Sequence, residues 1–222
     1  MAFFLWTWLL NTCTIVGALS LGTYFLTIWA QELLGKTEQD LKAKYEAKWA
    51  LVTGGSSGIG LALVNRLASQ GINVVIVAYP DALLPKAIET LSLQYPSVEL
   101  RSIALDLSTP TAADVIAKDT EDLDINLVFN NAGYIKPGLF ATLPLATLLA
   151  NYNTNATVTI AITHLFLNRM LAKGQKGMLC FTGSSGGFIP GPMSSIYSST
   201  KAWMTVCLMP KTIRISKHAT LY

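Results

Sequence analysis

A tyrosine and a lysine four positions apart are the first side chains in this sequence that could carry out chemistry together. Tyr197 and Lys201 begin and end the segment YSSTK, and residues at this spacing share one face of a helix. A phenol ordinarily has a pKa of about 10, and an ammonium held beside it favours the phenolate and lowers that pKa. The pair therefore predicts a tyrosine that exchanges a proton with an alcohol or carbonyl oxygen near neutral pH.

A hydroxyl and a run of small residues follow two of the expected strands. Ser184 lies 13 positions before Tyr197, just beyond an apolar run typical of a buried strand. Asn131, Ala132 and Gly133 end another such run, and their small size would let a backbone pass close to a ligand. Ligands of open parallel sheets bind at the carboxyl ends of the strands, so these residues are expected to face one cleft. Each segment taken alone also fits an ordinary turn.

A glycine-rich loop lies between the first expected strand and its helix. Residues 53–60 read TGGSSGIG, with the spacing G-x-x-x-G-x-G. Glycines there let the backbone approach a pyrophosphate closely, and the N-terminus of the helix favours its charge. No Lys-Ser or Lys-Thr pair follows the last glycine, which excludes a nucleoside triphosphate P-loop and leaves a purely structural turn as the alternative. The candidate binding residues are Gly54, Ser56, Ser57, Gly58, Ile59 and Gly60.

Strands and helices alternate through the part of the chain that holds these segments. Short runs rich in Val, Ile and Leu predict buried strands at residues 49–53, 74–78, 100–105, 126–129 and 178–181. Apolar residues at helical spacing predict helices at residues 61–69, 84–93, 111–118 and 145–172, with another beginning near Tyr197. This alternation is typical of an α/β fold with a Rossmann-like doubly wound parallel sheet. Such a sheet would bring all the candidate residues to one edge.

The first 31 residues contain no charged side chain and explain much of an unusual composition. The chain is 51% hydrophobic and only 13% charged, which excludes a disordered protein. The uncharged run exceeds the roughly 20 residues that cross a bilayer as a helix, and Trp6, Trp8 and Trp29 near its ends fit an aromatic belt. We therefore expect a transmembrane anchor at residues 1–31, a charged linker at 32–47 and a folded domain at 48–222. A secretory signal peptide is the alternative, although the run lacks a basic start and is long for one.

Charge and cysteine placement restrict the partners further. Lysines follow the expected span at positions 36, 42, 44 and 48 and none precedes it, so the positive-inside rule places the domain on the cytoplasmic side. A net charge of +3 without a basic stripe gives no reason to expect nucleic acid. The three cysteines lie far apart, and His164 and His218 have no ligand-type neighbours, so neither a disulfide framework nor a metal site is predicted.

In combination these motifs resemble the short-chain dehydrogenase/reductase family over roughly residues 48–206. The resemblance rests on TGGSSGIG, on NNAG at residues 130–133, on Ser184 and on YSSTK. It implies that Tyr197 gives or takes the proton, that Lys201 binds the nicotinamide ribose and lowers the pKa of the tyrosine, and that Ser184 orients the substrate oxygen.

The resemblance implies two more site residues. An asparagine of the long helix would support a proton relay through water, and the spacing favours Asn155, with Asn151 and Asn153 as close competitors. Asp106, after the third strand, is similar to the aspartate that binds adenine in the family. Gly54, Ser57 and the rest of the glycine loop would bind the nicotinamide dinucleotide together with Asn131, Ala132 and Gly133.

The apolar N-terminus and the segment IYSSTK resemble, more narrowly, the membrane-bound branch of 17β-hydroxysteroid dehydrogenases and very-long-chain 3-oxoacyl-CoA reductases. That branch implies an oxidoreductase that interconverts a carbonyl and a secondary alcohol on a hydrophobic, lipid-like substrate such as a 3-oxoacyl chain or a steroid. It also implies a single-pass protein of the endoplasmic reticulum membrane, with the domain in the cytoplasm. These residues leave open whether the protein forms a homo-oligomer.

The choice of cofactor is less clear from the residues. The branch favours NADP(H), usually through an arginine just after the second strand. Here that position reads Tyr79-Pro80-Asp81, and Ser57 in the glycine loop is uncharged as well. No acidic residue ends the strand to bind a ribose 2′-hydroxyl either. NADP(H) is therefore expected from the resemblance, with NAD(H) as the alternative.

The C-terminus departs from the family. Members continue the Tyr-Lys helix for several turns and add two more strands, whereas this sequence meets Pro210 soon after Lys201 and ends at Tyr222. We therefore expect a C-terminally truncated fold that lacks one edge of the sheet and most of the substrate pocket. The alternative function is a non-catalytic membrane protein that retains dinucleotide or partner binding.

Overall fold

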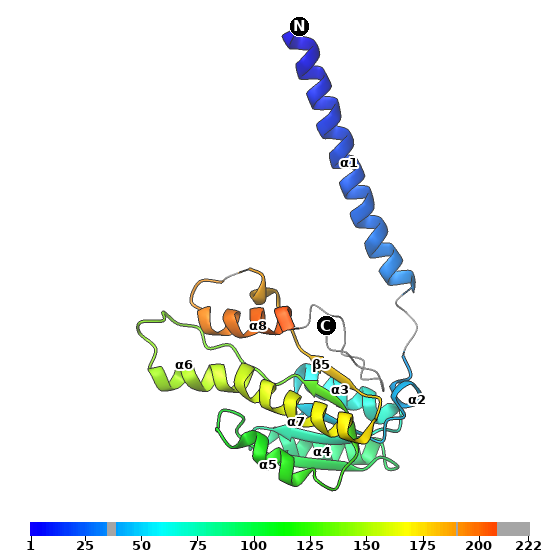
Figure 1. Cartoon of the computed structure of the whole chain (residues 1–222), viewed down its shortest axis with the longest axis vertical. Helices are drawn as coiled ribbons and strands as arrows, with labels where there is room; N and C mark the ends of the chain where they lie inside the picture. Colours follow the sequence, from blue (N-terminus) through cyan, green and yellow to red (C-terminus); the bar gives the residue numbers. More distant parts are fainter. Residues whose placement is uncertain (35–38, 190, 208–222) are drawn as a thin grey trace. The chain divides into compact units, whose positions relative to one another are not determined.

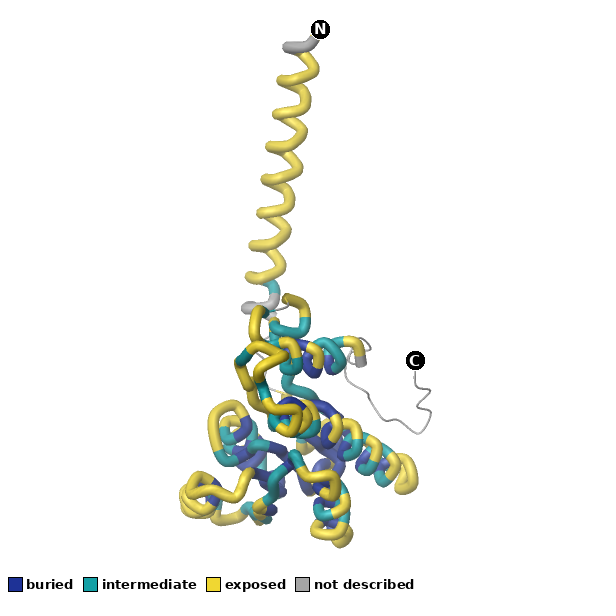
Figure 2. Tube along the Cα trace, turned by 90° about the vertical axis from the view of Figure 1, so that its left-hand side faces the viewer, coloured by how far each residue is buried: buried dark blue, intermediate teal, exposed yellow. Residues whose placement is uncertain are grey.

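The computed structural model describes residues 1–34, 39–189 and 191–207, which divide between Asp40 and Leu41 into two units. The first unit is one helix, α1 (Ala2–Leu34). Its segment Phe4–Ala30 has a mean hydropathy of 1.5, and no part of its most apolar stretch is buried. Figure 2 shows residues 4–29 of this helix as exposed. Among the described helices it is the one long and apolar enough to cross a membrane, by length and composition alone.

The second unit is built on a sheet of five parallel strands, as the sequence predicts. They are β1 (Trp49–Thr53), β2 (Asn73–Ala78), β3 (Leu100–Ala104), β4 (Ile125–Asn130) and β5 (Met178–Phe181). Their spatial order is β3-β2-β1-β4-β5, so the winding reverses between β1 and β4. Ligands of doubly wound sheets bind at such a reversal, beyond the carboxyl ends of the strands.

Helices cover both faces of this sheet, which explains the unbroken apolar strands (Figure 1). Along β1, Leu51 faces one core cluster with residues of α5 (Ala112–Asp119) and α7 (Val158–Lys173). Ala50 and Val52 face the other, with residues of α3 (Gly58–Ser69) and α4 (Leu83–Gln94). Successive side chains of a strand point to opposite faces, so each β1 residue is buried by one helical layer or the other.

The predicted long helix contains a π-helical turn. It consists of α6 (Leu145–Tyr152), the π-turn η1 (Asn153–Thr157) and α7, in which Val158 N–H donates to the Asn153 carbonyl five residues earlier. Apolar periodicity predicts the length of this helix but not the extra residue, because a single inserted position hardly alters the pattern. Such turns often occur at functional sites.

Part of the predicted linker packs against the sheet. Residues 41–45 form the short helix α2 (Leu41–Tyr45), and the side chains of Tyr45 and Ala47 are only 4% and 2% exposed. The buried side chain of Asn126 donates to the Tyr45 carbonyl at 2.8 Å. These contacts join residues 41–47 to the second unit.

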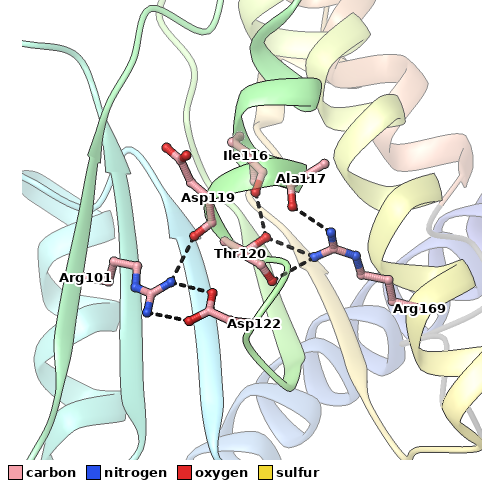
Figure 3. A network of polar contacts seen from close by, with 7 residues as sticks. All are labelled: Arg101, Ile116, Ala117, Asp119, Thr120, Asp122 and Arg169. Carbon is pink, nitrogen blue, oxygen red and sulfur yellow. Dashed lines mark hydrogen bonds and ion pairs between the residues drawn. The ribbon is translucent and has the colours of Figure 1, made fainter.

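Two arginines hold the C-terminal end of α5 between β3 and α7 (Figure 3). Arg169 of α7 donates to the carbonyls of Ala117 at 2.7 Å and Thr120 at 3.1 Å, and to the Thr120 hydroxyl at 3.0 Å. Arg101 of β3 donates to the Asp119 carbonyl at 3.0 Å and to both carboxylate oxygens of Asp122. Ala117 and Asp119 lie in the last turn of α5, whose carbonyls have no partners within the helix, and the two arginines supply donors to them.

The chain beyond β5 is described as far as α8 (Ser195–Cys207). This helix carries the Tyr-Lys pair and begins two residues before the tyrosine, close to the predicted start. The predicted interruption at Pro210 falls in residues 208–222, which lie outside the described part of the chain.

Candidate active site

The predicted site residues meet at the carboxyl edge of the sheet. A cleft of about 520 Å³ lies beyond the ends of β1, β4 and β5. It is lined by Gly54, Ser57, Gly58, Ile59, Gly60, Asn131, Ala132, Gly133, Thr182, Gly183, Ser184, Tyr197 and Lys201. Four segments that are distant in sequence therefore form one cavity at the point where the winding of the sheet reverses.

The glycines of the loop are required where helix α3 meets strand β1. A Cβ on Gly60 would lie 2.0 Å from the Gly54 carbonyl oxygen, so no other residue fits there without moving the backbone. Gly54 and Gly58 have φ values of +67° and +52°, a region that favours glycine. Nothing lies within 4 Å of a Cβ position on Gly58, which leaves the N-terminus of α3 open to the cleft.

Two threonines and an asparagine join the three strand ends behind the cleft. The Thr53 hydroxyl accepts from the backbone N–H groups of Asn131 and Ala132, both at 3.0 Å. The Asn131 side chain donates to the Thr53 carbonyl at 3.1 Å and accepts from the Thr182 hydroxyl at 3.0 Å. Sequence reasoning did not single out Thr182; its place directly after the fifth strand was the available signal.

Lys201 is buried and held in place by this network. Its side chain is 3% exposed, and Nζ donates to the Thr182 carbonyl at 2.7 Å. Nζ also lies 5.7 Å from the ring centroid of Tyr197, so the two residues share a face of α8 as predicted. Burial lowers the pKa of Lys201, because an ammonium loses hydration in this position.

The side chains of Ser184 and Tyr197 both lie close to Gly186. A Cβ on that glycine would be 3.3 Å from Cε1 of Tyr197 and 3.5 Å from Oγ of Ser184. The serine oxygen accepts from the Gly186 N–H at 3.2 Å, which leaves its own O–H able to donate to a ligand. The two hydroxyl-bearing side chains therefore border the same part of the cleft.

Asn155 lies behind Gly133, in the middle of the π-turn. It is fully buried, accepts from the Tyr134 N–H at 3.0 Å and donates to the Tyr134 carbonyl at 2.9 Å. A Cβ on Gly133 would lie 3.2 Å from Asn155 Oδ1 and 3.5 Å from Lys201 Nζ. Asn155 thus holds the loop after β4 and adjoins the lysine.

The two competing asparagines occupy different positions. Asn151 donates to the Tyr134 carbonyl at 2.8 Å, one turn before Asn155. Asn153 points toward Ser108 and lines a separate cavity between α5 and α7. Of the three, Asn155 is the one that the structure places beside Lys201.

Two predicted binding residues lie outside the lining of the cleft. Asp106 follows β3, and its Oδ1 accepts from the Ser108 N–H at 2.9 Å. Ser56 lines a neighbouring groove, which it shares with Ser57 and Gly58. The predicted contacts of Asp106 with adenine and of Ser56 with the dinucleotide therefore concern the surface beside the cleft.

The sequence profile of the short chain dehydrogenase family matches residues 48–211. This chain belongs to the short-chain dehydrogenase family. Very-long-chain 3-oxoacyl-CoA reductase-A of Danio rerio is 32% identical over 197 residues, which make up 86% of this chain and 60% of that protein. The match confirms the resemblance to that branch, and the chain spans less than two thirds of the length of this relative.

Solved structures of short-chain dehydrogenases have the same fold. The bulky-bulky ketone specific alcohol dehydrogenase of Comamonas testosteroni is 28% identical, with a TM-score of 0.67 over 72% of this chain and 66% of its own. A short-chain dehydrogenase of Sphingobium yanoikuyae in complex with NADPH is 27% identical, with a TM-score of 0.66 over 72% of this chain and 64% of its own. The Rossmann-like fold predicted from the sequence is therefore confirmed.

The nicotinamide cofactor of the short-chain dehydrogenase family fits the residues present. The open N-terminus of α3, with glycines whose missing side chains bring the backbone to the surface, suits a pyrophosphate. Gly54, Gly58, Ile59 and Gly60 would bind it, and the cleft continues to Lys201. Within the described ranges, no group of three or more His, Cys, Asp or Glu side chains could hold a metal ion.

Proposed function

We propose that this chain is a membrane-anchored NAD(P)(H)-dependent oxidoreductase that interconverts a carbonyl and a secondary alcohol. The observation that carries the proposal is the single cleft in which the glycine loop meets Ser184, Tyr197 and Lys201. A dinucleotide bound at the N-terminus of α3 would extend toward the Tyr-Lys pair, where a carbonyl group could be reduced.

Each residue of the cleft then has a distinct task. When bound, the nicotinamide supplies a hydride for reduction of the carbonyl carbon or accepts one in the reverse direction. The Tyr197 hydroxyl donates a proton to the carbonyl oxygen during reduction and accepts it during oxidation. The Ser184 O–H donates a hydrogen bond to the same oxygen.

Lys201 would bind the nicotinamide ribose. An ammonium has three donors; one bonds the Thr182 carbonyl and a second contacts the Met204 sulfur at 3.7 Å. The third is available to the cleft that the residue lines. Asn155 would connect Lys201 to solvent through water, in addition to holding the Tyr134 backbone.

A lipid-like substrate, either a 3-oxoacyl chain or a steroid, suits the surface around the cleft. Relatives of this chain are named for 3-oxoacyl-CoA reduction. The segments that follow β4 and β5 expose large apolar side chains, and they are joined by a hydrogen bond from Gly138 N–H to the Met193 carbonyl at 2.8 Å. The exposed residues are Ile135, Leu139, Phe140, Phe188, Ile189 and Met193.

The proposal extends to location. Helix α1 would span the endoplasmic reticulum membrane once, with the second unit in the cytoplasm, because lysines follow the helix at positions 36, 42, 44 and 48. The wholly exposed apolar surface of α1 supports a membrane anchor. We expect detergent, but not alkaline carbonate, to extract the protein from microsomes. We also expect protease to reach the C-terminal side of the chain in intact microsomes.

Turnover by the purified full chain tests the proposed chemistry. We expect NADPH oxidation with a long-chain 3-oxoacyl-CoA or a 3-oxo steroid, and a loss of roughly 10³-fold in kcat for Tyr197→Phe, because that variant has no proton to transfer. Nucleotide binding by the wild type without any turnover would contradict the enzyme and support a binding protein instead. Circular dichroism of the variant controls for folding.

A further inference from the structure

A second cavity lies beside the cleft, on the other side of the glycine loop. This groove of about 340 Å³ runs between α3 and α4, and it shares Ser57 and Gly58 with the cleft. The cleft continues from those two residues toward β4, β5 and α8. The groove continues from them toward α4 instead. A ligand that crosses the N-terminus of α3 could therefore enter both.

The groove, like the cleft with its Lys201, has one charged residue in its lining, as far as the structure describes the chain. Lys86, in the first turn of α4, is the one charged residue among the described residues that line it. The side chain of Lys86 is exposed. The hydroxyl residues Ser56 and Ser57 of the glycine loop line the same groove. Asp81, in the segment before α4, does not line the groove and accepts from the Leu83 N–H at 2.9 Å.

A cation with nearby hydroxyl donors is the arrangement that binds a phosphate monoester. In a dinucleotide held at the pyrophosphate by α3, one half extends toward Lys201. The adenosine half must leave the loop on its other side. NADP(H) differs from NAD(H) only by a phosphate on the adenosine ribose, and selective proteins supply a basic group for it.

We propose that Lys86, together with the hydroxyls of Ser56 and Ser57, binds the 2′-phosphate of NADP(H) and makes this chain selective for it. The assignment rests on the proposed dinucleotide-dependent function. It supplies the basic group missing from Tyr79-Pro80-Asp81, where the sequence offers no cation. Lys86 comes eight positions after the end of β2, and the packing of α4 beside α3 brings it to the groove.

Binding of NADPH and of NADH by the full chain in detergent micelles, measured by calorimetry, tests this assignment. We expect the wild type to bind NADPH more tightly. Lys86→Gln should weaken NADPH binding roughly tenfold, as the loss of one hydrogen bond to a charged group implies, and leave NADH binding within about twofold. Lys86→Arg should retain most of the preference. NADPH binding by the wild type should also weaken more steeply with salt than that of the lysine variant.

Lys118→Gln is the matched control, because Lys118 is an exposed lysine near the end of α5. It should leave both affinities unchanged. Three results would overturn the assignment and leave a dinucleotide-dependent function in place. In the first, Lys86→Gln weakens the binding of both nucleotides equally; in the second, it changes neither affinity. In the third, the wild type binds NADH more tightly than NADPH. A wild type that binds neither nucleotide would overturn the proposed function and this assignment with it.

Discussion

Buried or half-buried cations donate to backbone carbonyls in two regions of the domain, with different consequences. At the end of α5, Arg169 makes three hydrogen bonds that end at Ala117 and Thr120, and its guanidinium lies 5.3 Å from the Phe166 ring centroid. At the carboxyl edge, Lys201 donates to the Thr182 carbonyl and also lines a cleft. The first cation completes a helix end, whereas the second keeps a donor for a ligand.

The two networks differ in what their donors bind and in the pKa shifts of their cations. Around α5 every hydrogen bond drawn in Figure 3 ends on a protein oxygen, and pairing with Asp122 raises the pKa of Arg101. At Lys201, burial lowers the pKa instead, since no carboxylate in the described part of the chain compensates for lost hydration. Desolvation without a charge partner, next to a cavity, is typical of a functional site.

The largest effect that would test this comparison is expected from Lys201→Met. Turnover should fall roughly 10²- to 10⁴-fold, because the variant cannot hold the ribose or support the tyrosine. The free energy of unfolding should change by less than about 1 kcal/mol, because the variant loses the hydrogen bond to Thr182 but also avoids the desolvation cost of a buried ammonium. Steady-state kinetics and urea unfolding measure the two.

The same variant also tests how the contribution of Lys201 to stability changes with pH. Because the pKa of Lys201 is lowered on folding, the unfolded chain binds more protons between the folded and unfolded pKa values, and stability from this group rises with pH there. The free energy of unfolding of the wild type minus that of Lys201→Met should therefore increase as the pH approaches about 10. A difference that falls with pH would contradict the assignment of Lys201 as a cation buried at a cost.

Arg169→Met should show the opposite behaviour. The apolar part of the side chain is retained, but the Ala117 carbonyl and the Thr120 hydroxyl lose their arginine donor, while the Thr120 carbonyl keeps the Leu123 N–H at 3.3 Å. We expect a loss of roughly 2 kcal/mol in the free energy of unfolding and less than a threefold change in kcat. A loss of turnover as large as that of Lys201→Met would show that the α5 network belongs to the site.

The smallest effect is expected from Asp122→Asn at the exposed edge of the same network. Arg101 holds the pKa of Asp122 below its usual range through a hydrogen bond. That contribution is present above the unfolded pKa of about 4 and is lost as the pH falls through the folded pKa. The thermal midpoints of wild type and variant should therefore differ slightly at neutral pH and converge in acid. Persistence of the difference at low pH would argue against an ionic contribution.

Local patterns in the sequence account for most of the fold and for the choice of the candidate catalytic residues. Apolar runs such as 74–78 predict strands because a parallel strand covered on both faces needs no polar side chain. The spacing of Tyr197 and Lys201 predicts their shared face, and Gly54, Gly58 and Gly60 predict the turn into α3. Each of these signals lies within about eight residues, where covalent geometry fixes the relation between side chains.

Tertiary structure alone decided which distant residues lie beside the candidate catalytic residues. Thr182 supports Lys201 through its carbonyl oxygen, a group that every residue has and that no sequence pattern marks. Asn155 was separable from Asn151 and Asn153 only once the π-turn set which of them adjoins Lys201. Lys86 lines the same groove as Ser56 and Ser57 because α4 and α3 lie on the same face of the sheet. Such contacts depend on the packing of whole elements, and the spacing of residues along the chain does not encode them.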